Sequence, residues 1–191
     1  MATQSVFFAA LVVCVAINAS ETAQNDGISF YGVYGPTIAL VVVGYATAGI
    51  GLWRVAGWLA RHGAPGVLFV GARVVALGLG LLLVTPYDEG AFLNWSHMTV
   101  GVAVALMQLA SSVALLRRRR AWPVRLVFAV QLAGGVIAAA SLPDWHFPML
   151  LRGESLYALG YALSLYIWVD VVVPLPGGVR LAHDDVDERR E

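Results

Sequence analysis

The sequence predicts an all-α fold, namely a polytopic integral membrane six-helix bundle with both termini in the cytoplasm. The first observation is composition, since 59% of the 191 residues are hydrophobic and only 13% are charged. A soluble domain of this length cannot bury that much apolar surface. The second is a series of apolar runs near the length of about 20 residues that crosses a bilayer. The third is that all twelve basic residues are arginines, placed mainly at alternate connections between the runs.

Six segments have the length and apolar character of membrane spans. In chain order they are Thr3–Ala19, Pro36–Ala60, Gly66–Thr85, His97–Leu116, Ala121–Leu142 and Ser155–Val173.

Prolines mark the expected ends of these segments. Pro86, Pro143 and Pro174 each follow a segment, where a helix can stop without losing interior hydrogen bonds. Pro36 and Pro123 fall in first turns, where the missing N–H costs little.

The first segment has an alternative interpretation as a cleaved signal peptide. Met1–Val6 carries no positive charge, and the apolar run ends at Asn18-Ala19-Ser20 without an A-x-A cleavage site. We therefore expect an uncleaved first helix.

The arginines give the orientation through the excess of positive charge on cytoplasmic loops. Ten of the twelve are Arg54 and Arg61 at one connection, Arg117–Arg120 and Arg125 at another, and Arg180, Arg189 and Arg190 near the C-terminus, and Arg152 is the only one at the other connections. Placing these ten inside leaves three connections outside. We expect one transmembrane domain over 1–180 and a charged cytoplasmic tail over 181–191. The arginine quartet can bind anionic headgroups or a partner, or serve only as a topology anchor. Abundant Ala, Val, Gly and Arg without lysine indicates a bacterial source and hence the plasma membrane.

Several classes of function lack support in this composition. The net charge of zero gives no reason to expect nucleic acid. The single cysteine, Cys14, excludes an internal disulfide and a thiolate metal cage. His97 and His146, with nearby carboxylates, could ligate zinc, but they lack the spacing of known zinc motifs. They also sit at helix ends, unlike the haem ligands of bis-histidine membrane cytochromes. We expect neither a metal nor a cofactor.

Two polar pairs are predicted inside the membrane. Arg73 lies about 12 Å into the third segment, at 1.5 Å per residue, and Asp170 lies near the cytoplasmic end of the sixth. An unpaired charge at such depth costs about 3 kcal/mol or more, so we predict an intramembrane Arg73–Asp170 ion pair, with Arg54 as a competing partner. It would act as a helix clamp or, alternatively, as part of a relay. Gln108 and Gln131 are predicted to hydrogen-bond across adjacent helices.

The three outer connections are rich in aromatic and acidic residues, and they form a candidate pocket for a lipid headgroup or small ligand. The candidate residues are Tyr31, Tyr34, Asp88, Glu89, Trp95, His97, Asp144, Trp145, His146, Arg152, Glu154, Tyr157 and Tyr161. An aromatic belt at the membrane surface, together with helix caps such as Asp88 and Ser96, is the alternative explanation. Asp144 or Glu154 is the expected partner of Arg152.

A serine nucleophile can also be drawn at this face. It would combine Ser29 or Ser96 with His97 or His146, and with Asp144. No G-x-S-x-G elbow supports it.

Three short motifs resemble a known group of proteins. They are Gly27-Ile28-Ser29-Phe30-Tyr31-Gly32 at the end of the first outer loop, Thr85-Pro86-Tyr87-Asp88, and His97 at the start of the next span. They resemble small bacterial six-helix membrane proteins of unknown function, which are distantly similar in layout to the Frag/DRAM/Sfk group linked to lipid remodelling and membrane trafficking. The resemblance implies an outward-facing polar site around Asp88 and His97. The loop Pro143–Glu154 does not match it.

The function that we expect first is that of a non-enzymatic integral membrane protein whose outer aromatic and polar pocket engages membrane lipids, a small ligand or a membrane partner, including a second copy of the chain. The alternative is a membrane-embedded enzyme acting on a lipid or cell-envelope precursor at the outer leaflet through His97, His146 and nearby carboxylates. A small carrier is a third possibility, but no internal repeat supports it.

Overall fold

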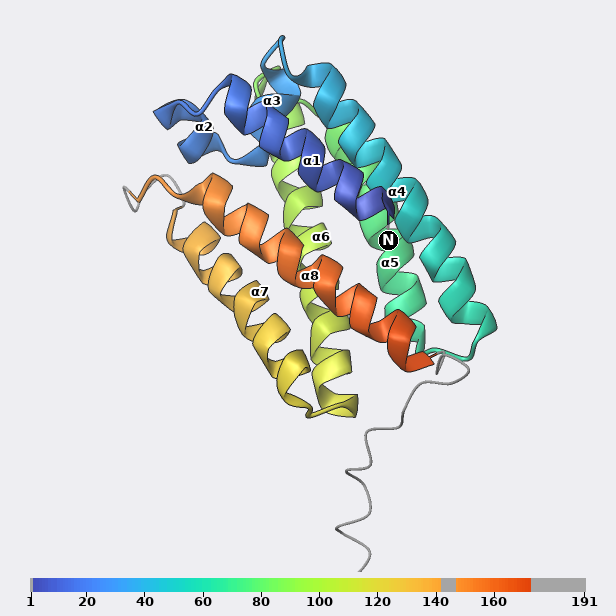
Figure 1. Cartoon of the computed structure of the whole chain (residues 1–191). Coiled ribbons are helices and arrows are strands. Elements are labelled where there is room, and N and C mark those ends of the chain that lie inside the picture. Colours follow the sequence, from blue (N-terminus) through green and yellow to red (C-terminus); the bar gives the residue numbers. More distant parts are fainter. Residues whose placement is uncertain (1, 142–146, 173–191) are drawn as a thin grey trace, which may run out of the picture.

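The computed structural model describes residues 2–141 and 147–172, and within them every regular element is a helix. The helices are α1 (Ala2–Ile17), α2 (Glu21–Asp26), α3 (Ile28–Val33), α4 (Ile38–Arg61), α5 (Gly66–Val84), α6 (Ala91–Arg118), α7 (Trp122–Ala140) and α8 (Leu150–Val172). Figure 1 shows the long helices side by side as a bundle, with α2 and α3 at one end. The α4–α5 and α6–α7 connections lie at the opposite end.

Four of these helices, α4 to α7, are long and apolar enough to cross a membrane. They contain 24, 19, 28 and 19 residues, against the roughly 20 that a span requires. The predicted all-helical architecture and the character of a multi-pass membrane protein are therefore supported. α1 has only 16 residues.

Two helices begin well before the apolar segment that predicted them. α6 starts at Ala91 instead of His97, and α8 starts at Leu150 instead of Ser155. Hydropathy marks only the part of a helix that fits the hydrocarbon layer, whereas backbone hydrogen bonding can continue into the polar boundary. Ser96 consequently lies inside α6 and donates to Phe92 O at 2.8 Å, so its prediction as a helix cap is wrong.

The start of α1 lies beside the second half of α4. A Cβ atom at Gly51 would collide with Thr3, and Gln4 Nε2 lies 3.5 Å from Ala48 O. Gly51 is ten residues before the end of α4 at Arg61, or about 15 Å at 1.5 Å per residue. α1 therefore runs along α4 without reaching its far end.

α7 packs closely along α8 because small residues lie at their interface. A Cβ atom at Gly134, Gly153 or Gly160 would collide with backbone atoms of the facing helix. Gln131 is fully buried against Gly160, and neither its amide nitrogen nor its amide oxygen has a hydrogen-bond partner among the described residues. The predicted Gln108–Gln131 hydrogen bond is therefore wrong, because Gln131 faces α8.

Arg73 is exposed on α5, and its guanidinium carbon lies 5.5 Å from the centre of the Trp53 ring on α4. This distance is within the range of a cation–π interaction. The side chain of Asp170 lies outside the described residues, so the Arg73–Asp170 ion pair stays a prediction.

The segment predicted as the first outer loop folds into the short helices α2 and α3. Ser20 caps α2 by accepting from Ala23 N at 3.3 Å. Gly27 separates the two helices with a φ of 73°, a conformation that favours glycine. The fully buried Tyr31 donates its hydroxyl to Asn18 O at 2.7 Å, which ties α3 to the end of α1.

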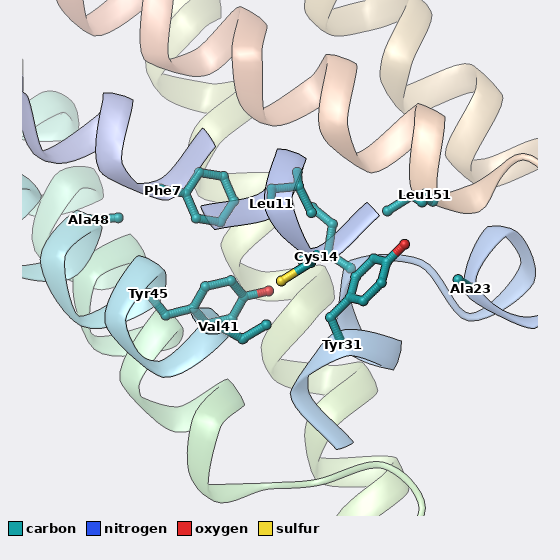
Figure 2. Packing of buried hydrophobic residues seen from close by; sticks show 10 residues of the cluster. Phe7, Leu11, Cys14, Ala23, Tyr31, Val41, Tyr45, Ala48 and Leu151 are labelled. Carbon is teal, nitrogen blue, oxygen red and sulfur yellow. The ribbon is translucent and has the colours of Figure 1, made fainter. Parts of the chain in front are cut away.

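Below α2 and α3 lies an apolar cluster formed mainly by α1, α3 and α4 (Figure 2). Cys14, with no exposed surface, lies between the rings of Tyr31 and Tyr45 in this view. The cluster also contains Phe7 and Leu151. The cluster holds the two short helices against the bundle, because burial of its apolar side chains stabilises the packing of α1, α3 and α4.

Candidate functional site

A chain of two hydrogen bonds through His97 lies at the α2–α3 end of the bundle. His97 Nδ1 is 2.6 Å from Thr85 O, and His97 Nε2 is 2.7 Å from Ser29 Oγ. A carbonyl oxygen can only accept, so Nδ1 carries the proton and the neutral ring presents Nε2 as an acceptor. The Ser29 hydroxyl therefore donates to His97.

The helix ends explain why these three groups meet. Thr85 is the C-cap of α5, where a carbonyl has no partner within its own helix. His97 lies in the second turn of α6, which follows α5 directly and can satisfy that carbonyl. Ser29 lies in the first turn of α3, which the apolar cluster around Tyr31 holds in place.

A small pocket with a volume of about 60 Å³ opens beside this hydrogen-bond chain. Its lining is mainly apolar and comprises Ser29, Gly32, Val33, Ile38, Val41, Val42, Tyr45, Leu82, Leu83, Pro86, Tyr87 and His97. A single water needs at least 10–15 Å³ of such space, so the pocket holds a few waters or one small polar group. It cannot contain a whole lipid.

Tyr87 connects the pocket to α2. Its hydroxyl donates to Asp26 Oδ2 at 2.9 Å, and its ring centre lies 6.0 Å from that of His97. Burial raises the pKa of Tyr87, and the hydrogen bond to Asp26 with the charges of Asp26 and Asp88 raises it further. The phenol therefore remains a neutral donor, and the α5–α6 connection is tied to the two short helices.

Glu154 holds the same short helices from the other side. Its Oε2 accepts a hydrogen bond of 2.7 Å from the backbone N–H of Ile28, the first residue of α3. Glu154 precedes the apolar segment of α8 that begins at Ser155. Burial raises the pKa of Glu154 to about 7, although the Ile28 N–H favours the charged form.

Five further predicted site residues do not line the pocket. Tyr34 stacks on Phe30 with ring centres 5.3 Å apart. Asp88, Glu89 and Arg152 are exposed, and Trp95 is 74% exposed.

Two predicted residues on α8 lie deeper in the bundle. Tyr157 donates its hydroxyl to Ala105 O on α6 at 2.6 Å. Tyr161 is buried in a cluster with Leu52, Val75 and Val104. Both side chains pack between helices, and neither lines the pocket.

Three predicted residues, Asp144, Trp145 and His146, lie outside the described residues. Arg152 as a partner of Asp144 therefore stays a prediction. Between residues 2 and 141 and between 147 and 172, no three histidine, cysteine or acidic side chains come together as a metal site would require.

The sequence alone named Ser29 only as one of several possible partners of a histidine. The structure pairs it with His97, whereas Ser96 donates to a carbonyl of its own helix. The Thr85 carbonyl and the Tyr45 ring, which complete the site, carry no sequence signal because they function through their position alone.

Comparisons of the chain with protein families, with curated proteins and with solved structures give no match.

Proposed function

We propose that the chain is a multi-pass plasma-membrane protein of bacteria in which α1 and α8 also act as spans and the α2–α3 end faces outward. Support comes from the exposed arginines at the opposite end, with Arg61 in the last turn of α4 and Arg117 and Arg118 in the last turn of α6. Cytoplasmic loops carry such an excess of arginine.

The proposed activity is the binding of a small polar group, such as part of a lipid headgroup, in the pocket beside His97. The observation that carries this proposal is the Ser29–His97–Thr85 hydrogen-bond chain at the wall of a mainly apolar pocket. Pockets with a few placed polar groups in an apolar lining are typical of ligand sites. The volume of about 60 Å³ limits the buried part of the ligand to a few heavy atoms.

Histidine modification tests this proposal. The purified protein in detergent is titrated with water-soluble dihexanoyl phosphatidylglycerol or phosphatidylcholine, and carbethoxylation by diethyl pyrocarbonate is measured at each histidine by mass spectrometry. We expect saturable protection of His97. His62 is the internal control, because it is exposed and stacks on Trp58 at the opposite end of α4. Equal modification of His97 with and without either lipid would contradict the proposal.

A further inference from the structure

The Ser29 hydroxyl is placed for proton transfer. Its oxygen lies 2.7 Å from His97 Nε2, within the range of 2.6–3.2 Å in which a base can take a proton from a nucleophile. Both side chains are only partly buried and both line the pocket. A group that enters the pocket can therefore reach the serine oxygen.

The Thr85 carbonyl gives His97 the tautomer that a base needs. In serine hydrolases a third group holds the imidazole with Nδ1 protonated, so that Nε2 is free to accept the serine proton. A backbone carbonyl at 2.6 Å from Nδ1 serves this purpose here. It carries no full charge, so it stabilises the protonated imidazole less than a carboxylate would. We expect slow chemistry.

We infer that Ser29 is a nucleophile that accepts acyl groups from carboxylic esters of membrane lipids, with His97 as its base. This inference rests on the proposed function, because the ester group has to enter the same pocket. Esters are the substrate class because a Ser–His pair transfers acyl groups and because the pocket lies at the end of a membrane bundle.

The step balances without a further reactant. Ser29 Oγ forms a bond to the ester carbonyl carbon while its proton passes to His97 Nε2. The bond from that carbon to the ester oxygen breaks, and the leaving alcohol takes the proton from Nε2. Water or a second alcohol then attacks the acyl-serine by the same route in reverse and restores Ser29.

Tyr45 is the fourth residue of the pocket lining with a polar side chain. Four residues of the lining have polar side chains, and three of them are already engaged, namely Ser29, His97 and Tyr87. The Tyr45 hydroxyl makes no hydrogen bond among the side chains that the structure describes. In Figure 2 this hydroxyl lies beside the sulfur of Cys14, so Tyr45 is assigned no role in the step.

Covalent labelling of the full chain tests the inference. The purified protein in detergent is incubated with a fluorophosphonate probe, and the modified peptide is identified by mass spectrometry. We expect one adduct, on Ser29, with Ser29→Ala abolishing it and His97→Gln slowing it by about 100-fold or more. Ser96→Ala is the matched control and should label as the parent does. No adduct on Ser29 of the unmodified protein would overturn the inference, as would unchanged labelling of His97→Gln.

A gain of thiol reactivity provides a second readout that does not depend on loss of function. In a Cys14→Ala background, Ser29→Cys should react with iodoacetamide at least about 10-fold faster than Ser96→Cys, because His97 lowers the pKa of a neighbouring thiol. Equal rates would count against His97 as a base. Cys14 does not itself line the pocket, and its replacement leaves the introduced cysteine as the single thiol of the chain.

The two experiments separate the inference from the proposed function. Protection of His97 by the short lipids without an adduct on Ser29 would leave a binding pocket and overturn the nucleophile. An adduct on Ser29 without protection of His97 would keep the reactive serine and contradict lipid binding. Release of hexanoate from dihexanoyl phosphatidylglycerol by the parent protein, and not by Ser29→Ala, would support both.

Discussion

The Glu154 carboxylate accepts a hydrogen bond from the backbone N–H of Ile28, although 126 positions separate the two residues in the sequence. This contact joins the start of α8 to the start of α3, where Gly27 leaves no room for a side chain against Glu154. Since α3 carries Ser29, the contact fixes one wall of the pocket.

The first prediction is that the arrangement with Glu154 buried against Ile28 becomes less stable as the pH rises, because burial disfavours the charged carboxylate. A glutamate released to solvent loses its proton near its ordinary pKa of 4.5, whereas Glu154 buried against Ile28 keeps its proton up to about pH 7. The state in which Glu154 is buried against Ile28 therefore binds more protons between pH 4.5 and pH 7. The stability of this state falls over that range and is constant above about pH 7. Hydrogen exchange of the Ile28 amide, corrected for intrinsic rate, should show increasing opening over this range.

Glu154→Gln is the control for the pH effect. The amide oxygen can still accept from Ile28 N, but it has no proton to lose. Tyr45 is the other ionisable group that interacts with Glu154 electrostatically, and a phenol stays protonated between about pH 4.5 and 7. An unchanged pH dependence in Glu154→Gln would show that another group is responsible.

The second prediction concerns Gly27. We expect Gly27→Ala to lower the free energy of unfolding by about 1–3 kcal/mol, because its φ is 73° and a Cβ atom would collide with Glu154 Oε2. Gly90→Ala separates the two causes, since Gly90 has a φ of 103° with nothing within 4 Å of a Cβ atom. Unfolding in mixed micelles measures both variants. An equal loss in the two would mean that the contact with Glu154 adds nothing.

The third prediction concerns the buried amide of Gln131. Gln131→Met keeps the side-chain length and removes two polar atoms that have no partner among the described residues. An unsatisfied buried polar group costs about 1–3 kcal/mol, so we expect this variant to be more stable by about 1 kcal/mol or more. Gln108→Met, at a partly buried position on α6, should change stability less. A clear loss for Gln131→Met would indicate that a buried water satisfies the amide.

The fourth prediction concerns Arg73. A double-mutant cycle with Trp53→Leu and Arg73→Leu should give a coupling energy of about 0.5–1 kcal/mol, as expected for a cation over an aromatic ring. A second cycle with Asp170→Leu tests the ion pair predicted from the sequence. Additive losses in this second cycle would contradict the pair, and they would leave Trp53 as the measured partner of Arg73.

Hydropathy predicted the helical segments of this chain with good accuracy. Four predicted segments overlap α4 to α7 because a run of about 20 apolar residues is a local property. It could not predict that α6 and α8 extend beyond the apolar part, or that the first connection folds into α2 and α3. The position of α3 depends on hydrogen bonds to residues outside its own segment, from Tyr31 to Asn18 and from Ile28 to Glu154.

The sequence grouped residues by connection, and it could not predict which of their atoms meet. His97 lines a pocket, and Glu154 contacts the residue before Ser29 in the chain. Tyr31 and Tyr161 instead became packing residues, because aromatic composition does not tell which ring faces a core. Tyr45 lines the pocket from within a mainly apolar segment.

The sequence by itself determined an all-helical chain with the lengths and hydropathy of a membrane protein, because span length, proline positions and arginine clusters are local or additive properties. Only the tertiary structure decided which polar groups meet. Ser29 and His97 are 68 positions apart, and their hydrogen bond exists because α3 packs on α1 and α4 while α6 begins beside the end of α5. Close helix approach at Gly134, Gly153 and Gly160 likewise turned Gln131 toward α8. Contacts of this kind depend on which helix faces lie against each other, which no single segment of the sequence specifies.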